Sequence, residues 1–408
     1  MTRVLVLTTL FPNAAQPNHG IFVENRLRRT LALGGLEALV LAPVPYFPSR
    51  MEAFGRYAAF ARAPRRERRH GIEILHPRYV VVPKIGSLLA PALLYRAALA
   101  AVKKLAARGR FFDVIDAHYL YPDGVAAAML ARRLRIPFVL TARGSDVTQI
   151  PRNRSARTRI LMAMEDASAT VTVCEDLRRR LIDLGADGSR IVTLRNGVDL
   201  DLFTPGDRAA ARAALGLDRF TLLSVGHLIP RKGHHLIIEA MQTLPDCQLL
   251  IAGGGPMRDT LTRLASELRM TERVRLLGDI PHAQLPAVYR AADALVLASE
   301  REGWANVLLE SIACGTPVAA TDVNGTSEVV RSEAAGRLIA ERSPDSIAAA
   351  IRLLRRNMPR PEDTRRYAEG FGWEVIARAN KALLLSAART GYAGRDGSTA
   401  RAAAEALT

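Results

Sequence analysis

The stretch SEREGWANVLLESIACGTPV, Ser299–Val318, is the part of the sequence that best predicts the fold and its site. It follows the apolar run ADALVLAS, typical of a buried strand, and it opens a helix that Gly315 and Pro317 close. Glu302 precedes this helix, and Glu310 lies about one turn inside it, roughly 6 Å along the axis. The free N–H groups of the first turn would lie between the two carboxylates and attract an anion.

The two carboxylates can each accept hydrogen bonds from hydroxyl groups, and the anion site lies between them. This order suits a nucleotide-sugar, which has hydroxyl groups at both ends and a diphosphate between them. If the helix begins at Ala305 or Asn306, the backbone amides from Ala305 to Val307 would form the anion site. Two solvated carboxylates on a helix are the plain alternative. A glycosidase-like acid/base pair, with carboxyl groups about 5–9.5 Å apart, is another. The spacing alone leaves these alternatives open.

Length and composition indicate two α/β domains. A chain of 408 residues fits two domains of roughly 150–200 residues, and nearly half of its residues are apolar. The three cysteines are scattered without metal-ligand spacing, as expected in a reduced compartment. The N-terminal run TRVLVLTTLFP is typical of a first strand and not of a signal peptide, and no run of about 18 apolar residues predicts a membrane span. We expect a cytoplasmic protein.

The net charge of +17 raises the question of a nucleic-acid ligand, which we do not expect. Aromatic residues make up only 5% of the chain, and none alternate with a basic stripe. The arginine-rich segment 50–70 and the basic, partly amphipathic segment 88–110 are compatible with a peripheral position on an anionic membrane surface. A solvated loop followed by an ordinary core helix is the alternative.

In the first half, short apolar strands alternate with helical stretches, which predicts a parallel sheet covered on both faces. Ligands bind such sheets beyond the carboxyl ends of the strands. His118 and the pair Arg143 and Asp146 follow two of these strands, and Gly20 precedes the first helix. Arg143 could hold an acceptor phosphate or pair with Asp146, and Gly20 could equally mark a plain turn.

The second half repeats the alternation and places further ligand-type residues after its strands. Gly226 leads into a loop with Arg231 and Lys232, two cations able to grip a diphosphate. The next strand ends in Gly254 and Gly255, which let the backbone approach a ligand closely. Neither a Walker loop nor a dinucleotide fingerprint is present.

These features in this order resemble the retaining, GT-B-fold glycosyltransferases of family 4, also called group 1. The resemblance covers almost the whole chain and is strongest from Arg231 to Glu310. It implies two doubly wound Rossmann-like domains facing across a cleft, the second for a nucleotide-diphospho-sugar donor and the first for an acceptor. Many members have His-Gly where this chain has Arg143-Gly144, which leaves open what Arg143 does.

The resemblance also implies a role for each matching residue. The catalytic residues would be His118, Arg231, Lys232 and Glu302, with Glu302 holding the sugar hydroxyls and the two cations holding the diphosphate. The acceptor side would include Arg143 and Asp146. Donor-binding residues would be Gly20, Gly226, Gly254, Gly255, Ile280, Ala305, Asn306, Val307 and Glu310.

The turn-rich segment RNGVDLDLFTPGD matches the interdomain segment of this family and places the domain boundary near residue 200. The expected parts are a first domain at 1–198, joined by a C-terminal helix at 372–389, a second domain at 207–371, and a disordered tail at 390–408.

We therefore expect a retaining transfer of a sugar from a UDP- or GDP-sugar to an acceptor hydroxyl of a cell-envelope glycan or lipid-linked saccharide. No residue stands out as a covalent nucleophile, and without an Asp-x-Asp motif neither a metal nor another cofactor is expected. Two alternatives remain: a related GT-B enzyme such as a nucleotide-sugar 2-epimerase, and a non-catalytic scaffold that binds a membrane or a partner.

Overall fold

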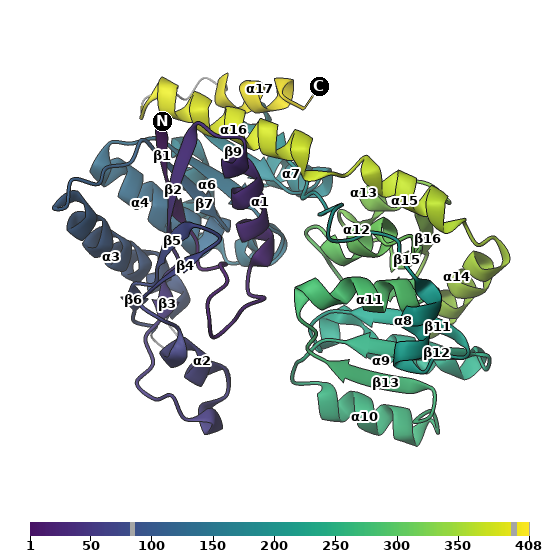
Figure 1. The fold of residues 1–408 in the computed structure, drawn as a ribbon. Coiled ribbons are helices and arrows are strands. Elements are labelled where there is room, and N and C mark those ends of the chain that lie inside the picture. Colours follow the sequence, from purple (N-terminus) through teal and green to yellow (C-terminus); the bar gives the residue numbers. More distant parts are fainter. Residues whose placement is uncertain (82–85, 393–397, 408) are drawn as a thin grey trace. The chain divides into compact units, whose positions relative to one another are not determined.

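Apolar strands that alternate with helices build two sheets in the computed structural model, one in each half of the chain (Figure 1). The structure describes residues 1–81, 86–392 and 398–407. The contacts divide the chain into unit 1, Met1–Asn196 with Glu374–Thr408, and unit 2, Gly197–Trp373. The predicted α/β class holds for each unit, because a largely or wholly parallel sheet lies at the centre of both.

The sheet of unit 1 has the strand order β10-β9-β8-β7-β1-β2-β5-β4. All of its neighbouring strands pair in parallel except β4 and β5, which are antiparallel. Its central strands are buried on both faces, which explains their continuous apolar sequences. The strands are β1 (Thr2–Leu7), β2 (Leu36–Leu41), β4 (Arg66–Arg69), β5 (Ile72–Leu75), β7 (Val114–His118), β8 (Phe138–Ala142), β9 (Ala169–Thr172) and β10 (Ile191–Thr193), with a separate pair of β3 (Val44–Pro45) and β6 (Arg78–Tyr79).

Helices cover both faces of this sheet. One face packs against α1, α16 and α17, whose apolar side chains share a core with Val4 and Val6. On the other side α4 contacts β7 and β8, and α3 and α6 both pack against α4. The helices are α1 (Ile21–Ala32), α2 (Arg56–Arg62), α3 (Gly86–Ala106), α4 (Val125–Leu134), α5 (Ser145–Thr148), α6 (Arg154–Asp166), α7 (Glu175–Asp183), α16 (Trp373–Thr390) and α17 (Ser398–Glu405).

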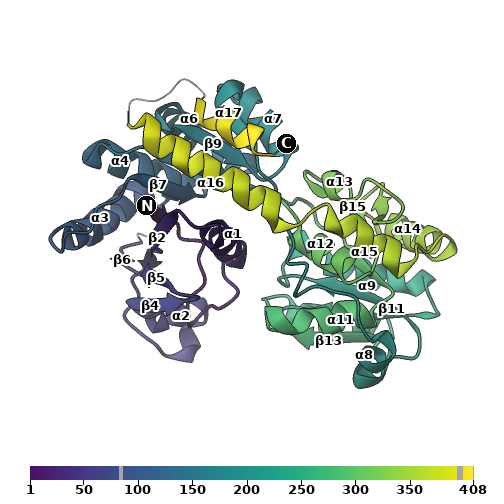
Figure 2. The ribbon, with the colours of Figure 1, turned by 45° about the horizontal axis from the view of Figure 1, so that its top comes forward.

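The C-terminal segment corrects one expectation. Residues 398–405 form the helix α17, which lies beside α16 (Figure 2), so the predicted disorder is wrong for this part of the tail. Its alanine-rich sequence favours a helix, and Ala400 and Ala403 are buried in the core of unit 1. Residues 393–397 and 408, also in the predicted tail, lie outside the described residues.

The sheet of unit 2 is wholly parallel, with the order β13-β12-β11-β14-β15-β16. The core between this sheet and α9, α10 and α14 contains Ile237, Leu261 and Ile351. On the other side, α11 contacts β11, and α12 contacts β14 and β15. The strands are β11 (Phe220–Val225), β12 (Cys247–Ala252), β13 (Val274–Gly278), β14 (Ala294–Leu297), β15 (Val318–Thr321) and β16 (Gly336–Ile339). The helices are α8 (Arg208–Leu215), α9 (His234–Ala240), α10 (Arg258–Glu267), α11 (Leu285–Ala291), α12 (Asn306–Ala313), α13 (Thr326–Val329), α14 (Pro344–Arg356) and α15 (Pro361–Glu369).

The chain passes between the units twice, and the two passages run side by side. Val198 N donates to Phe371 O (2.9 Å), and Gly197 lies so close to the backbone of Trp373 that a Cβ there would clash. Residues 199–206, which we expected to be a connection, belong to unit 2. Across the described part of the chain, we find no helix that is both long enough and apolar enough to cross a membrane.

Candidate active site

The loops after the strands of unit 2 bring the predicted charged residues together at the carboxyl edge of its sheet. Arg231 and Lys232 lie in the loop after β11, and Glu302 lies in the loop after β14, its direct neighbour in the sheet. The side chains of Lys232 and Glu302 meet although 70 residues separate them, with Lys232 Nζ donating to Glu302 Oε1 at 2.6 Å. Arg231 NH1 lies 3.9 Å from Glu302 Oε2 and donates to Arg301 O (2.8 Å).

The neighbours of Glu302 favour its ionised form, although the side chain is buried. Its side chain is only 9% exposed, and Ser299 Oγ donates to its Oε1 at 2.6 Å. Burial raises the pKa of this carboxyl, but the charge and hydrogen bond of Lys232, together with Ser299 and Arg231, outweigh burial and lower the pKa overall. A carboxylate that is charged and largely shielded from water can accept strong hydrogen bonds from a ligand.

Gly226 lies next to the stem of Lys232. Its φ of +154° lies in a region that side chains rarely adopt, and a Cβ there would lie 3.5 Å from the stem of Lys232. The space beside the lysine stem would accommodate a Cβ, so the backbone conformation, and not crowding, is what favours glycine here.

Helix α12 begins at Asn306, as predicted, and carries Glu310 one turn in. Within the described residues, no side chain caps its N-terminus. The carboxylate of Glu310 is held by two residues that we did not predict. Its Oε1 lies 3.1 Å from His282 Nε2, and Tyr289 donates to its Oε2 at 2.8 Å. Phe203 packs edge-on against both partner rings, with ring centroids 5.1 and 5.9 Å apart.

The glycine loop after β12 lies beside the loop after β13. Gly254 N donates to Asp279 Oδ1 (2.7 Å), so this amide is bound within the protein, and Gly255 approaches the backbone of Leu228 too closely to allow a Cβ. Ile280, next to Asp279, is half-buried. The predicted donor contacts of Gly254, Gly255 and Ile280 stay predictions.

At the carboxyl edge of unit 1, a second set of charged residues forms a buried network. Arg143 NH2 donates to His118 Nδ1 (2.7 Å), and Arg143 NH1 donates to Asn196 Oδ1 (3.3 Å). Because a guanidinium cannot accept a proton, His118 Nδ1 is the acceptor and its proton lies on Nε2, which is 3.4 Å from Asp116 Oδ2. Arg26 also donates to Asn196 Oδ1 (3.1 Å).

This network keeps His118 neutral. The residue is buried, and its pKa is lowered, mainly by burial and further by the charges of Arg143 and Arg26, although Asp116 opposes them. Both ring nitrogens face protein groups. The contact of His118 with a transferred sugar therefore stays a prediction.

Asp146 organises its own loop. Its carboxylate is buried and accepts hydrogen bonds from the backbone amides of Leu120 (2.8 Å), Gly144 (2.7 Å) and Arg143 (3.0 Å). It thus binds the backbone of Arg143 and not, as we had considered, its guanidinium. Gly20 has φ +70° and no room for a Cβ against Leu10, so its conformation is required where α1 begins. Acceptor contacts of Asp146 and donor contacts of Gly20 stay predictions.

Comparison with known proteins identifies the family. Residues 207–371 match the model of "Glycosyl transferases group 1", and residues 57–202 match that of "Glycosyltransferase Family 4". A protein of Bacillus subtilis named "Putative teichuronic acid biosynthesis glycosyltransferase TuaC" is 30% identical over 356 residues, 86% of this chain and 88% of that protein. The chain belongs to glycosyltransferase family 4.

Solved structures agree with the GT-B fold of this family. A sucrose-phosphate synthase from Thermosynechococcus elongatus aligns with a TM-score of 0.77 at 22% identity, over 92% of this chain and 96% of that one. HepE of Anabaena, in complex with UDP-glucose, aligns with a TM-score of 0.72 at 19% identity, over 95% and 99% of the two chains. As a group 1 glycosyltransferase, the chain is a retaining enzyme that uses a nucleotide-sugar.

Sequence analysis did not predict four side chains of the candidate site. Ser299 and Asn324 contact Glu302, the latter through the Glu302 amide (3.2 Å), while His282 and Tyr289 bind Glu310. Ser299 lies inside the quoted stretch, three residues before Glu302, and its spacing could have pointed to it. The other three lie in separate loops or helices, and nothing in their local sequence marks them.

Over residues 1–81, 86–392 and 398–407, no cluster of three or more His, Cys, Asp or Glu side chains could hold a metal ion. The three cysteines are buried and unbridged.

Proposed function

We propose that this enzyme transfers a sugar from a UDP- or GDP-sugar to an acceptor hydroxyl of a cell-envelope glycan or lipid-linked saccharide. Unit 2 would bind the donor and unit 1 the acceptor. The observation that carries the proposal is the 2.6 Å contact of Lys232 with Glu302, with Arg231 beside it, at the carboxyl edge of a parallel sheet. The UDP-glucose bound in the HepE structure supports the donor class, and the name of the Bacillus relative, a putative teichuronic acid biosynthesis glycosyltransferase, supports the acceptor class.

Each charged group has a part that matches its chemistry. The compact ammonium of Lys232 and the fork of Arg231 would neutralise the diphosphate. Glu302 would accept hydrogen bonds from hydroxyls of the donor sugar, and Glu310, held by His282 and Tyr289, from the ribose. The first-turn amides of α12 would add to the anion site.

The largest contribution to the rate would come from the cations that contact the leaving diphosphate, Arg231 and Lys232. As the glycosidic bond breaks, negative charge grows on the diphosphate, and fixed cations stabilise it more in the transition state than in the ground state. The leaving diphosphate would help to take the proton of the acceptor hydroxyl on the same face of the sugar, which retains the configuration.

A thermal-shift screen against UDP, GDP and their sugars tests the donor site, and product analysis with candidate acceptors tests transfer. We expect one nucleotide family to raise the melting temperature of the native protein, and to raise that of Glu310→Ala less at the same nucleotide concentration. No stabilisation by any nucleotide would favour the non-catalytic scaffold. Conversion of the donor-sugar without an acceptor would favour an epimerase.

We also propose a cytoplasmic enzyme that docks on anionic membranes through unit 1. Strand β4 contains Arg66, Arg68 and Arg69, with the Arg66 side chain 67% exposed. Phe54 and Tyr57, nearby in the chain, are each 46% exposed. The protein should float with anionic vesicles at low salt and be released as salt rises. Equal binding to neutral and anionic vesicles, or none to either, would contradict this docking.

A further inference from the structure

Two cavities lie one after the other along the helical side of unit 1, outside the charged network. The first has a volume of about 540 Å³ and is lined by side chains that include Leu88, Tyr121, Ile150, Arg152 and Ala156. Its position is set by the sheet, because Tyr119 at its wall directly follows the last residue of β7. Tyr119 is tied to Ser145 at the start of α5 by a 2.7 Å contact between their hydroxyl oxygens. One end of this cavity therefore lies at the carboxyl edge of the sheet.

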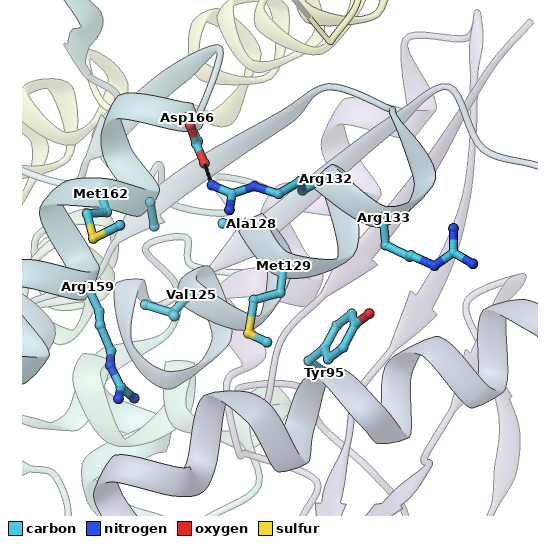
Figure 3. A pocket seen from close by; sticks show the side chains of 10 residues that line it. Tyr95, Val125, Ala128, Met129, Arg132, Arg133, Arg159, Met162 and Asp166 are labelled. Atoms are coloured by element: carbon cyan, nitrogen blue, oxygen red, sulfur yellow. Dashed lines mark hydrogen bonds and ion pairs between the residues drawn. The ribbon is translucent and has the colours of Figure 1, made fainter.

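The second cavity, of about 470 Å³, lies between α3, α4 and α6 (Figure 3). Its lining includes Tyr95 from α3, Met129 and Arg133 from α4, and Arg159 and Met162 from α6. In the view of Figure 3, Met129 and Tyr95 lie next to one another, and Arg159 and Arg133 lie on opposite sides of the pocket.

Arg159 joins the two cavities. It lines the second cavity and donates to the carbonyl of Leu88, which lines the first, at 2.7 Å. Along α6 the first cavity contacts Ala156, and the second continues from Arg159 to Asp166, a helical length of about 15 Å in total. We call these two cavities together the α3–α6 groove.

The groove combines apolar walls with positive charge. Met129 and Met162 are 38% and 55% exposed, and Leu88 is 41% exposed, although such side chains usually avoid water. Methionine is flexible and polarizable, which suits a wall that adapts to a flexible chain. The charged lining residues are Arg132, Arg133, Arg152, Arg159 and Asp166. The one carboxylate among them is paired with Arg132 at 2.7 Å, so the groove has an excess of cations.

We propose that the α3–α6 groove binds the apolar chain of an amphiphilic acceptor that carries an anionic group such as a phosphate. The anionic group lies near Arg152 and Arg159, and the reactive hydroxyl is directed toward the carboxyl edge of the sheet. The chain runs from Leu88, next to Arg159, along Met129 and Met162. This inference rests on the proposed function, since it names the class of acceptor.

Alkyl phosphates of increasing length test the groove without knowledge of the true acceptor. Butyl, hexyl, octyl and decyl phosphate are titrated into the full chain by calorimetry, each below its micelle concentration. We expect the affinity to rise about two- to fourfold for each added methylene, as for a chain that leaves water. Equal affinity for butyl and decyl phosphate would overturn the proposal, because only surface arginines would then bind the anion.

Substitutions at exposed positions locate the binding without disturbing the core. Met162→Glu and Leu88→Glu should each weaken decyl phosphate at least tenfold, and Arg152→Glu should weaken all the alkyl phosphates. The matched control is Leu353→Glu in unit 2, where the native side chain is 44% exposed, and it should bind as the native protein does. Native-like binding of decyl phosphate by both Met162→Glu and Leu88→Glu would also overturn the proposal.

The same variants separate this inference from the proposed function. Nucleotide binding is measured on each of them, and we expect it to be unchanged. If no nucleotide binds to the native protein while decyl phosphate binds in the groove, the proposed transferase function fails and the groove stands. If nucleotides bind and alkyl phosphates do not, the groove proposal fails alone.

Discussion

The carboxyl edges of the two sheets use charged side chains in different ways. In unit 2, ionisable groups contact one another through their side chains: Lys232 and Arg231 lie against Glu302, and His282 lies against Glu310. In unit 1, the carboxylate of Asp146 accepts hydrogen bonds from backbone amides, and the guanidinium of Arg143 donates to both His118 and Asn196. A pair of side chains can exchange its partners for those of a ligand, whereas a carboxylate that binds backbone amides holds a loop in place. The contacts of Asp146 therefore hold the loop after β8 in place at this edge of unit 1.

Two buried carboxyls show the same contrast in their pKa values. Burial raises both, but Glu302 has two cations beside it and its pKa is lowered overall. Asp123 in unit 1 is also buried and accepts hydrogen bonds from the amide and hydroxyl of Thr9, without a cation among the causes of its shift. Burial then prevails and raises the pKa of Asp123 to about 7. The charge of the partner, and not the depth of burial, decides the direction.

The largest effect is expected from Lys232→Ala, which breaks the pairing in unit 2. We expect kcat to fall by about 10²–10³, because the variant loses a fixed cation at the leaving group. Steady-state kinetics with the identified donor and acceptor measure it, and Lys104→Ala, an exposed lysine in unit 1, is the control. If KM rises and kcat does not change, Lys232 binds the substrate and the transition state equally and does not stabilise the leaving group.

Glu310→Ala should weaken the nucleotide roughly 10–100-fold, since one or more charge-assisted hydrogen bonds to the ribose are lost. Calorimetry on the folded variant checks this, with Glu333→Ala as the control, because Glu333 is a 74% exposed glutamate of the same unit. Unchanged affinity would remove Glu310 from the donor site.

Arg143→Leu tests whether the network of unit 1 is structural. It removes a donor from both His118 and Asn196, and we expect the free energy of unfolding to fall by about 1–3 kcal/mol. The pKa of His118 should rise, because a neighbouring positive charge is removed. Denaturant unfolding and imidazole NMR measure the two effects, with the exposed Arg157→Leu as the control. If His118 has the same pKa in the variant and in the native protein, the contact between Arg143 and His118 is contradicted.

The smallest effect concerns the pairing of His282 with Glu310. Burial lowers the pKa of His282, but the hydrogen bond and charge of Glu310 raise it overall. The folded state therefore binds the proton more tightly than the unfolded state. The stabilisation is fully present below the ordinary histidine pKa and is lost as pH rises through the raised value.

We expect His282 to contribute about 1 kcal/mol or less to the free energy of unfolding. This contribution should be lost as the pH rises from about 6 to about 8.5. The difference from His282→Gln, measured by denaturant unfolding across that range, isolates the contribution. An identical pH dependence in the two proteins would show that the pair contributes nothing.

Much of the fold could be predicted from local patterns. Apolar runs, several of them bounded by Gly or Pro, predicted the strands β1, β2, β5, β7, β8 and β9 of unit 1 but not β3, β4 or β6. The stretch around α12 predicted both the start of that helix and its end before Gly315. Such patterns depend on neighbours in the sequence, so one sequence contains them. The helix α17 was missed because its short alanine-rich segment is stabilised by burial against β9 and β10, distant in the chain.

In the candidate site too, some features could be predicted from local sequence and others could not. The sequence by itself determined which charged residues follow the strands of a parallel sheet, and this was enough to bring Arg231, Lys232 and Glu302 to one edge. Only the tertiary structure decided that His282 and Tyr289 hold Glu310, and that Arg143 binds His118 instead of the carboxylate of Asp146. Strand order determines which edge a loop occupies. The partner of each side chain depends on ångström-scale distances between loops that are far apart in the chain, and no spacing within one sequence encodes those distances.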